Sequence, residues 1–269
     1  MIVDLHVHSS PSLLPRHHTD LEIGPLLAAA GIGTYVLKAH EGSTAARANL
    51  VGNGAVGSIV LNSPVGGANP DAVSVAASFG ARVVWLPTVS SEAHRAAQTS
   101  PELRVHRSMD FRAVPVCRDG ELLPEWEDVF EVVAAHDMVL ASGHVSIDEA
   151  ITAFRAARAH GVQRFLVNHP LMDFLGWRDD HVDALVELGV YVEIGVLADL
   201  TATGGRPATD RLAADYPHSL LVFGSDLGHV DHPDIDPGID SWLTTTESAL
   251  GGATLDLITE KNGEELLKP

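Results

Sequence analysis

Short apolar runs alternate along the chain with longer segments in which apolar and polar residues mix at helical spacing. The apolar runs predict eight strands, at residues 2–8, 35–40, 58–62, 82–88, 138–144, 164–170, 190–194 and 220–226. Most of these runs are almost continuously apolar, as is typical of parallel strands that are covered on both faces. The segments between them predict helices at residues 20–31, 44–51, 125–135, 147–160, 179–188, 209–214, 239–250 and 255–267, and one that begins at residue 69.

Strands that alternate with helices in this way predict an α/β protein of the (β/α)8 barrel class, in which some distortion is expected. A seven-stranded distorted barrel and a doubly wound sheet are the alternatives. No long linker and no low-complexity segment divides the chain. We therefore expect residues 1–269 to form a single barrel domain.

The alternation is interrupted after the fourth predicted strand by an insertion, at about residues 99–123. The end of this insertion predicts a hairpin around Asp119-Gly120, because this dipeptide suits the positive φ angles of a two-residue hairpin turn. An insertion between regular units is a candidate lid or subunit contact. Together with the loops that follow the strands, we expect it to determine which substrate is bound.

The composition narrows the class of protein. The chain has 269 residues, a length typical of one barrel. Its formal net charge of −19 argues against nucleic acid or an anionic membrane as a partner. Cys117 is the only cysteine, which excludes an intramolecular disulfide, and no apolar run reaches the length of a membrane span. Because no signal-peptide pattern is present, we expect a cytoplasmic protein. We also expect it to be a homo-oligomer and to act on a small-molecule substrate.

The first strand carries the motif His6-Val7-His8. Strand side chains alternate between two faces, so Asp4, His6 and His8 are expected on one face and Leu5 and Val7 on the other. The two imidazoles then share one side of the strand, at the spacing of two ligands of one metal ion. Taken alone, the motif is also compatible with hydrogen-bonded core histidines, so its interpretation depends on the other strand ends.

Polar residues recur at the carboxyl ends of the predicted strands, where barrel enzymes carry their active sites. These residues are His6, His8, Lys38, His40, Asn62, His144, His169 and Asp226. A barrel brings its strand ends together around one axis, so side chains from separate strands are expected to converge on one site. Imidazoles and a carboxylate form a donor set that suits zinc, manganese or iron.

The order of the motifs resembles the amidohydrolase superfamily of metal-dependent hydrolases. The matching residues are His6-Val7-His8 on the first strand, His144 on the fifth, His169 on the sixth and Asp226 on the eighth. The resemblance extends over the whole chain and looks more like a poorly characterised branch of the superfamily than like its well-studied enzymes. It implies one or two divalent ions, usually zinc, and hydrolysis of an amide, lactam, ester or phosphoester bond. It also implies that the four histidines and Asp226 bind metal, and that Asp226 accepts a proton from the attacking water.

The fourth strand departs from this resemblance. Two-metal members of the superfamily supply a carboxylated lysine or a glutamate there, whereas this strand ends with Trp85-Leu86-Pro87-Thr88. Lys38 and His40 share a face of the second strand instead. We expect His40 to be a further metal ligand and Lys38 to be an unmodified catalytic cation, paired with an inward carboxylate or with an anionic substrate group. Arg16 and Asn62 are predicted to bind substrate.

Three other functions are compatible with the sequence. A metal-dependent decarboxylase uses a similar barrel with fewer ligands. A phosphoesterase requires cationic groups near the metal, for which Arg16, Lys38 and Arg107 are available. A non-catalytic metal-binding protein is the third alternative. The number of ions is open as well, because His40 or His94 is available to hold a second one.

Overall fold

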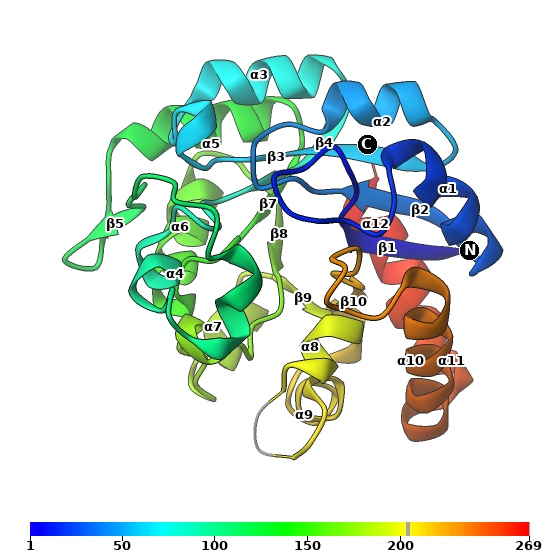
Figure 1. Cartoon of the computed structure of the whole chain (residues 1–269). Coiled ribbons are helices and arrows are strands. Elements are labelled where there is room, and N and C mark those ends of the chain that lie inside the picture. The colour runs from blue at the N-terminus through cyan, green and yellow to red at the C-terminus, as the bar shows by residue number, and fades with distance from the viewer. Residues whose placement is uncertain (203–204, 269) are drawn as a thin grey trace.

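The computed structural model describes residues 1–202 and 205–268. Within these residues, eight parallel strands form one sheet in the order β1–β2–β3–β4–β7–β8–β9–β10, which curls into a nearly closed barrel (Figure 1). The strands are β1 (Ile2–Val7), β2 (Ile32–Leu37), β3 (Ala55–Val60), β4 (Ala81–Trp85), β7 (Val139–Ala141), β8 (Arg164–Val167), β9 (Tyr191–Ile194) and β10 (Leu221–Phe223). The predicted α/β barrel is confirmed, and the seven-stranded and doubly wound alternatives are wrong.

Helices follow the strands, and most of them lie on the outside of the barrel (Figure 1). They are α1 (Asp20–Ala29), α2 (Ala45–Val51), α3 (Pro70–Ser78), α4 (Glu92–Ala96), α5 (Glu125–Ala135), α6 (Ile147–Ala159), α7 (His181–Glu187), α8 (Val196–Leu200), α9 (Ala208–Asp215), α10 (Ile235–Leu250), α11 (Gly252–Asp256) and α12 (Asn262–Leu267). Capping boxes, Thr19 with Glu22 and Ser146 with Glu149, start α1 and α6 where the sequence predicts. None of the helices in the described ranges is long and apolar enough to cross a membrane.

Most strands end earlier than predicted. β2 ends at Leu37 and β10 at Phe223, so Lys38, His40 and Asp226 lie in the loops after the strands rather than on them. β2 and β3 also begin earlier than predicted. The prediction started these strands only after Gly33 and Gly57, because the glycines interrupt the apolar runs. The glycine of β3 has a packing role, since a Cβ on Gly57 would lie 2.5 Å from the Cα of Ala45 in α2.

The predicted alternation of side chains along β1 is wrong at Val7. Val3 and Leu5 pack inside the barrel, whereas Val7 belongs to the core beneath the helices. The pairing of β1 with β2 is irregular between Asp4 and Val7. An irregularity of this kind changes the direction of the side chains that follow it. The prediction assumed that side chains alternate strictly between two faces, so it could not include this change. Both histidines of the motif nevertheless reach the mouth of the barrel.

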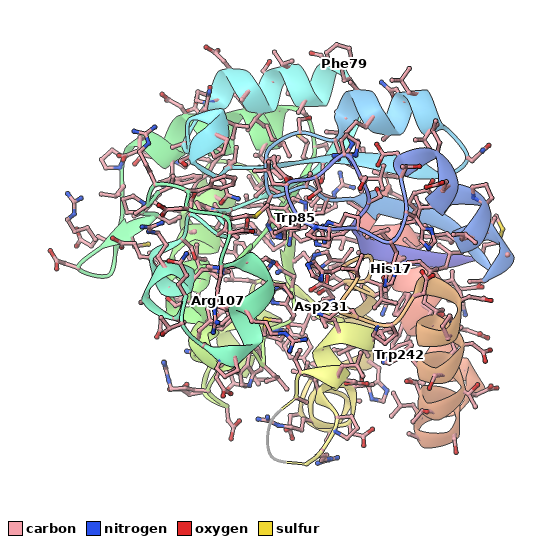
Figure 2. All side chains as sticks on the ribbon, in the orientation of Figure 1. His17, Phe79, Trp85, Arg107, Asp231 and Trp242 are labelled. Carbon is pink, nitrogen blue, oxygen red and sulfur yellow. The ribbon has the colours of Figure 1, made fainter. Side chains whose placement is uncertain are left out.

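The barrel is filled with apolar side chains below the site. They are Val3, Leu5, Val36, Val60, Val83, Trp85, Val139, Ala141, Leu166 and Val222. Trp85 is fully buried near the centre of the molecule (Figure 2). At the end of the barrel where the strands begin, Leu266 of α12 packs against this interior. Gly263 of the same helix lies so close to β1 that a Cβ there would be 2.8 Å from the Cβ of Val3. α12 therefore closes this end of the barrel.

The insertion after β4 contains a 3-10 helix, Pro101–His106, followed by the hairpin β5 (Cys117–Arg118) and β6 (Glu121–Leu122). The turn of the hairpin has φ angles of 53° at Asp119 and 82° at Gly120. These positive values are those that a two-residue turn with the sequence Asp-Gly adopts. The predicted hairpin is confirmed.

A partly buried ion pair ties the start of α1 to α2. Arg47 donates through Nε and Nη2 to the two carboxylate oxygens of Asp20, at 2.7 Å each, and the side chains are 19% and 11% exposed. Ser9 donates to the same carboxylate at 2.6 Å. Removing one partner leaves the other charge unpaired, so we expect Arg47→Met to lower the free energy of unfolding by about 2–3 kcal/mol, less than for a fully buried pair. Urea denaturation measures this loss.

Arg178 provides the matched control. It also makes a two-pronged pair, with Asp148 at 2.8 and 3.0 Å, but on the surface, where the side chains are 51% and 64% exposed. Water screens such a pair, so Arg178→Met should destabilise the protein less than Arg47→Met does. Equal losses in the two variants would show that burial does not decide how strongly these pairs stabilise the fold.

Candidate metal centre

The backbone places the end of β1 beside the loop after β10, where the barrel closes. The amide of Asp226 donates to the carbonyl of His6 at 2.8 Å, and the amide of His8 donates to the carbonyl of Leu227 at 3.0 Å. Asp226 has a φ of 52°, a left-handed conformation that aspartate adopts more readily than most residues. These contacts bring the side chains of His6, His8 and Asp226 together.

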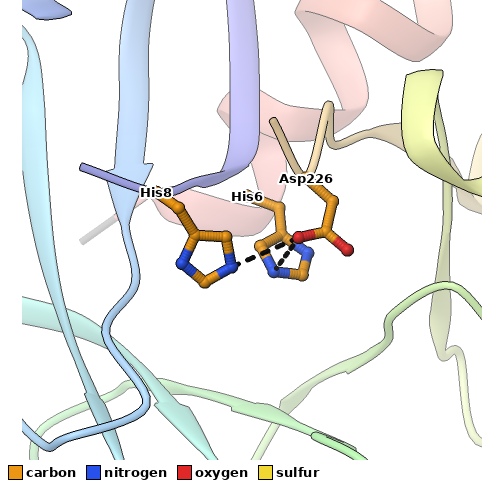
Figure 3. A group of neighbouring side chains, drawn as sticks. All are labelled: His6, His8 and Asp226. Carbon is orange, nitrogen blue, oxygen red and sulfur yellow. Dashed lines mark ion pairs between the residues drawn. The ribbon is translucent and has the colours of Figure 1, made fainter. Parts of the chain in front are cut away.

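His6, His8 and Asp226 form a compact group at the mouth of the barrel (Figure 3). Nε2 of His6 lies 3.1 Å from Oδ1 of Asp226, and Nε2 of His8 lies 3.2 Å from the same oxygen. One ligand atom of each residue lies within 4.8 Å of the others. In the part of the chain that the structure describes, no other trio of histidine, cysteine or carboxylate side chains has this geometry.

The surroundings of His8 determine its tautomer. Nδ1 lies 2.9 Å from the backbone carbonyl of Lys38, and because a carbonyl can only accept, Nδ1 carries the proton. Burial, and then the charges of Arg16 and Lys38, hold the pKa of His8 well below its usual range, so the ring is neutral. Nε2 is therefore a lone-pair nitrogen, and it faces a carboxylate oxygen of Asp226.

Glu193, on β9, orients His6 in the same way. Nδ1 of His6 lies 3.0 Å from Oε2 of Glu193, and the two side chains are 0% and 1% exposed. When Glu193 is ionised, as a divalent cation nearby would favour, it can only accept from Nδ1, and Nε2 then keeps its lone pair toward Asp226. Burial, and then the charge of Lys38, hold the pKa of His6 well below its usual range, so this ring is neutral too.

This donor set fits a divalent metal. Burial and the negative charge of Asp226 raise the pKa of Glu193 well above its usual range, and burial raises the pKa of Asp4 to about 7. A divalent cation beside Asp226 would stabilise the ionised forms of these carboxyl groups. Two neutral imidazoles and a carboxylate are ligands that zinc, manganese and iron accept. We conclude that His6, His8 and Asp226 are able to hold such an ion.

Lys38 lies inside the mouth of the barrel, as expected, and is 1% exposed. Its Nζ is 3.0 Å from Nε2 of His6 and 4.3 Å from the centroid of the Trp85 ring. These two contacts take the place of the expected close pairing with a carboxylate. Burial lowers the pKa of Lys38 to about 8, and the charges of Asp226 and Glu193 oppose that shift.

Four imidazole rings, those of His40, His94, His106 and His144, cluster next to this group. The ring centroids of His40 and His106 are 4.7 Å apart, and those of His94 and His144 are 4.9 Å apart. Nδ1 of His94 lies 2.8 Å from Nδ1 of His144, so one of these rings donates to the other. His40 stacks on His8 with a centroid distance of 5.2 Å. His40 and His144 thus line the site without joining the compact group.

His169 lies between the compact group and this cluster. Its ring centroid is 5.7 Å from that of His6 and 5.1 Å from that of His144, and its Nε2 is 4.0 Å from Oδ2 of Asp226. Nε2 accepts from the amide of Asn168 at 2.8 Å, whereas Nδ1 is buried with no hydrogen-bond partner. Metal ligation by His40, His144 and His169 stays a prediction.

Asn62 does not line the cavity, contrary to the predicted contact with substrate. Its side chain is fully buried, and its amide nitrogen donates to the carbonyl of His40 at 2.8 Å and to Oγ1 of Thr88 at 2.7 Å. Its amide oxygen accepts from the backbone amides of Thr88 and Ser90, at 2.8 and 3.1 Å. These bonds connect the loops after β2 and β4 and hold them in place. They also occupy the side-chain amide of Asn62, so it has no free group for a substrate.

The site opens into a cavity at the carboxyl ends of the strands, of about 510 Å³ when its open mouth is included. Its charged lining residues are Arg16, Lys38 and Asp226. Three further histidines line it that the sequence analysis did not identify: His106 of the insertion, and His229 and His232 after β10. The sequence signal for them is weak, because all three lie outside the predicted strands and among other surface-like histidines.

Comparison with solved structures finds matches over the whole chain at low identity. An amidohydrolase II matches with a TM-score of 0.59 and 13% identity, over 99% of each chain. A putative 2-pyrone-4,6-dicarboxylic acid hydrolase from Pseudomonas putida matches with a TM-score of 0.58 and 15% identity, over 99% of this chain and 97% of the other. A 2,6-dihydroxybenzoate decarboxylase from Rhizobium matches with a TM-score of 0.59 and 13% identity, over 99% of this chain and 98% of the other. These are amidohydrolase-superfamily structures, so the resemblance is confirmed at the level of the fold.

No curated protein matches the sequence. A family model does match, over residues 1–193. This range contains β1 to β8 and most of β9, and with them His6, His8, Lys38 and Glu193, whereas Asp226 lies beyond it. Since the match extends over well more than half of the chain, the protein belongs to this family, which is described as a family of unknown function (DUF6282).

Proposed function

We propose that this chain is a metal-dependent hydrolase that cleaves an amide, lactam or ester bond in a small molecule. The proposal depends on one observation: the lone-pair Nε2 atoms of His6 and His8 lie 3.1 and 3.2 Å from a single carboxylate oxygen of Asp226. Two acceptors that face one another repel unless a cation or a proton lies between them. Nζ of Lys38, 3.0 Å from Nε2 of His6, serves that nitrogen alone, whereas a metal ion would serve all three atoms at once. In the proposal, these three residues hold a divalent ion, with zinc expected first and manganese or iron next.

A divalent ion bound there would supply Lewis-acid chemistry, polarising a substrate carbonyl and making water more acidic. Asp226 accepts the proton of the attacking water and later returns it to the leaving nitrogen or oxygen. Its two oxygens suit a double role, because Oδ1 faces His6 and His8, while Oδ2 lies on the side of His169 at 4.0 Å. Glu193 holds His6 in the tautomer that binds metal.

Lys38 is proposed as the cation that stabilises negative charge developing on the substrate. Lys38→Met keeps a side chain of similar length and removes the charge beside Nε2 of His6. We expect turnover to fall by roughly 10²-fold, as on removal of one donor to a developing oxyanion. Metal content should stay near the wild-type level, because Nζ is not a ligand in this proposal. Turnover and elemental analysis of one preparation check both points, and loss of the metal would instead make Lys38 part of the metal centre.

The proposal is tested by elemental analysis of the purified protein, followed by assays with lactones, lactams, amides and esters. We expect at least about half an equivalent of zinc, manganese or iron, as a three-ligand site implies. Chelation should abolish hydrolysis, and addition of the metal should restore it. A protein that contains no divalent metal and takes none up would exclude the proposal.

A metal-dependent decarboxylase is the second candidate function. It is favoured by the presence of two cations, Arg16 and Lys38, in the lining of the cavity, where they could hold a substrate carboxylate. Product analysis separates the candidates, because a decarboxylase releases carbon dioxide and a hydrolase forms a new acid with an amine or alcohol. A phosphoesterase would release inorganic phosphate from phosphate esters added to the panel.

A further inference from the structure

The charge of the cavity differs from that of the protein as a whole. The chain has a formal net charge of −19, yet the charged lining residues of the cavity are Arg16, Lys38 and Asp226. Asp226 belongs to the metal centre, which leaves two cations facing the cavity. A cavity with this charge attracts small anions, although the outer surface repels them.

Arg16 lacks a carboxylate partner among the residues that the structure describes. Its Nε donates to Oγ of Ser12 at 3.3 Å, and its Nη2 lies 3.3 Å from Nδ1 of His8, which is itself a donor to a backbone carbonyl. No described carboxylate oxygen lies within 4.0 Å of its guanidinium nitrogens: Oε1 of Glu41 accepts from Ser12 at 2.9 Å, Oε2 of Glu41 is buried without a hydrogen-bond partner, and Asp226 faces the histidines. The guanidinium therefore has donors available to a ligand in the cavity.

The loop that carries Arg16 is held in place by the loop after β10. The amide of His17 donates to the carbonyl of Gly228 at 2.9 Å, and Nε2 of His17 lies 3.0 Å from the carbonyl of His232. Arg16 itself forms a backbone bridge with His229. Because the loop is already ordered, an anion that binds Arg16 does not have to order it.

Apolar side chains form another part of the cavity lining. Leu103 and Val105 come from the 3-10 helix of the insertion, Met172 from the loop after β8, and Leu197 from α8. Such side chains suit the uncharged part of a ligand whose polar groups are held elsewhere. The insertion thus supplies part of the wall of the cavity.

We infer that the substrate is a small anion with an apolar body, and that Arg16 binds its carboxylate or phosphate group. The inference rests on the proposed hydrolase for the bond that is cleaved, but the role of Arg16 concerns binding alone. A guanidinium holds a carboxylate or a phosphate with two parallel hydrogen bonds, which fixes its orientation as well as its position. The anionic group is thus separate from the bond that reacts beside His6, His8 and Asp226.

Calorimetric titration with two probes, benzoate and phenyl phosphate, tests the inference on metal-loaded and on chelator-treated protein. Arg16→Met should weaken binding of at least one probe by about tenfold or more in both preparations. Arg16→Lys keeps the charge but not the two-pronged geometry, so its loss should be smaller. Arg107→Met is the matched control, because it removes the same charge from an exposed residue of the insertion that does not line the cavity. It should leave both affinities unchanged.

The two probes distinguish the source of the anionic group. Dependence on Arg16 for benzoate supports a carboxylate, and dependence for phenyl phosphate supports a phosphate. The inference is overturned if Arg16→Met, shown to be folded by circular dichroism, binds both probes as tightly as the wild type, or if the wild type binds neither. Dependence on Arg16 in a protein that takes up no metal would keep the inference and exclude the hydrolase.

Discussion

Asp226→Asn should lower the rate of hydrolysis by about 10²–10⁴-fold, the range for loss of a general base, while much of the metal stays bound. The amide oxygen of asparagine can still ligate an ion, but it cannot accept a proton at neutral pH. The structure supports a division of labour within this carboxylate. Oδ1 faces Nε2 of His6 and His8 at 3.1 and 3.2 Å, and Oδ2 lies away from them on the side of His169.

The comparison requires turnover at saturating metal, with metal content measured on the same samples. Loss of metal together with activity would show only that Asp226 is a ligand. Near-normal turnover would place the proton transfer elsewhere, and His169 would then be the next residue to test. Glu193 is a weaker alternative, because it is 1% exposed and its carboxylate is engaged by His6 and by the backbone of His169.

The barrel and the compact group could be predicted because both follow from short-range patterns. The alternation of apolar runs and helices favours a parallel barrel, and a parallel barrel gathers its strand ends at one mouth. His6 and His8 are close in sequence, and Asp226 follows the strand that must lie next to β1 when the barrel closes. Predicting their proximity needed no knowledge of side-chain packing.

The rest of the site depends on contacts between loops, which no local pattern contains. Asn62 follows its strand in the same way as Lys38, but Thr88 and Ser90 of another loop occupy its amide, so it is structural. His106 reaches the cavity only because the insertion folds back over the mouth of the barrel. The engagement of His144 with His94 likewise depends on how α4 packs, so its hydrogen bond could not be predicted.

His6→Ala and His8→Ala should each lose most of the bound metal, and Glu193→Gln should weaken metal binding by about 10–100-fold. Each alanine removes one of the three ligand atoms that lie within 4.8 Å of one another. Glutamine keeps the shape of Glu193, but its amide can donate to Nδ1 of His6, where the carboxylate only accepts at 3.0 Å. The ring proton then moves to Nε2, the atom that has to bind metal. Competition with a chromophoric chelator at fixed pH measures the three affinities.

His160→Ala is the control, because His160 lies at the end of α6, outside the residues that line the cavity, and should leave metal binding unchanged. The order of the losses tests the tautomer argument separately from the ligand assignment. Full metal affinity in Glu193→Gln, together with loss in His6→Ala, would keep His6 as a ligand and show that Glu193 does not set its tautomer. Full affinity in both His6→Ala and His8→Ala would contradict the metal centre itself, since Asp226 alone offers too few ligand atoms to hold a divalent ion tightly.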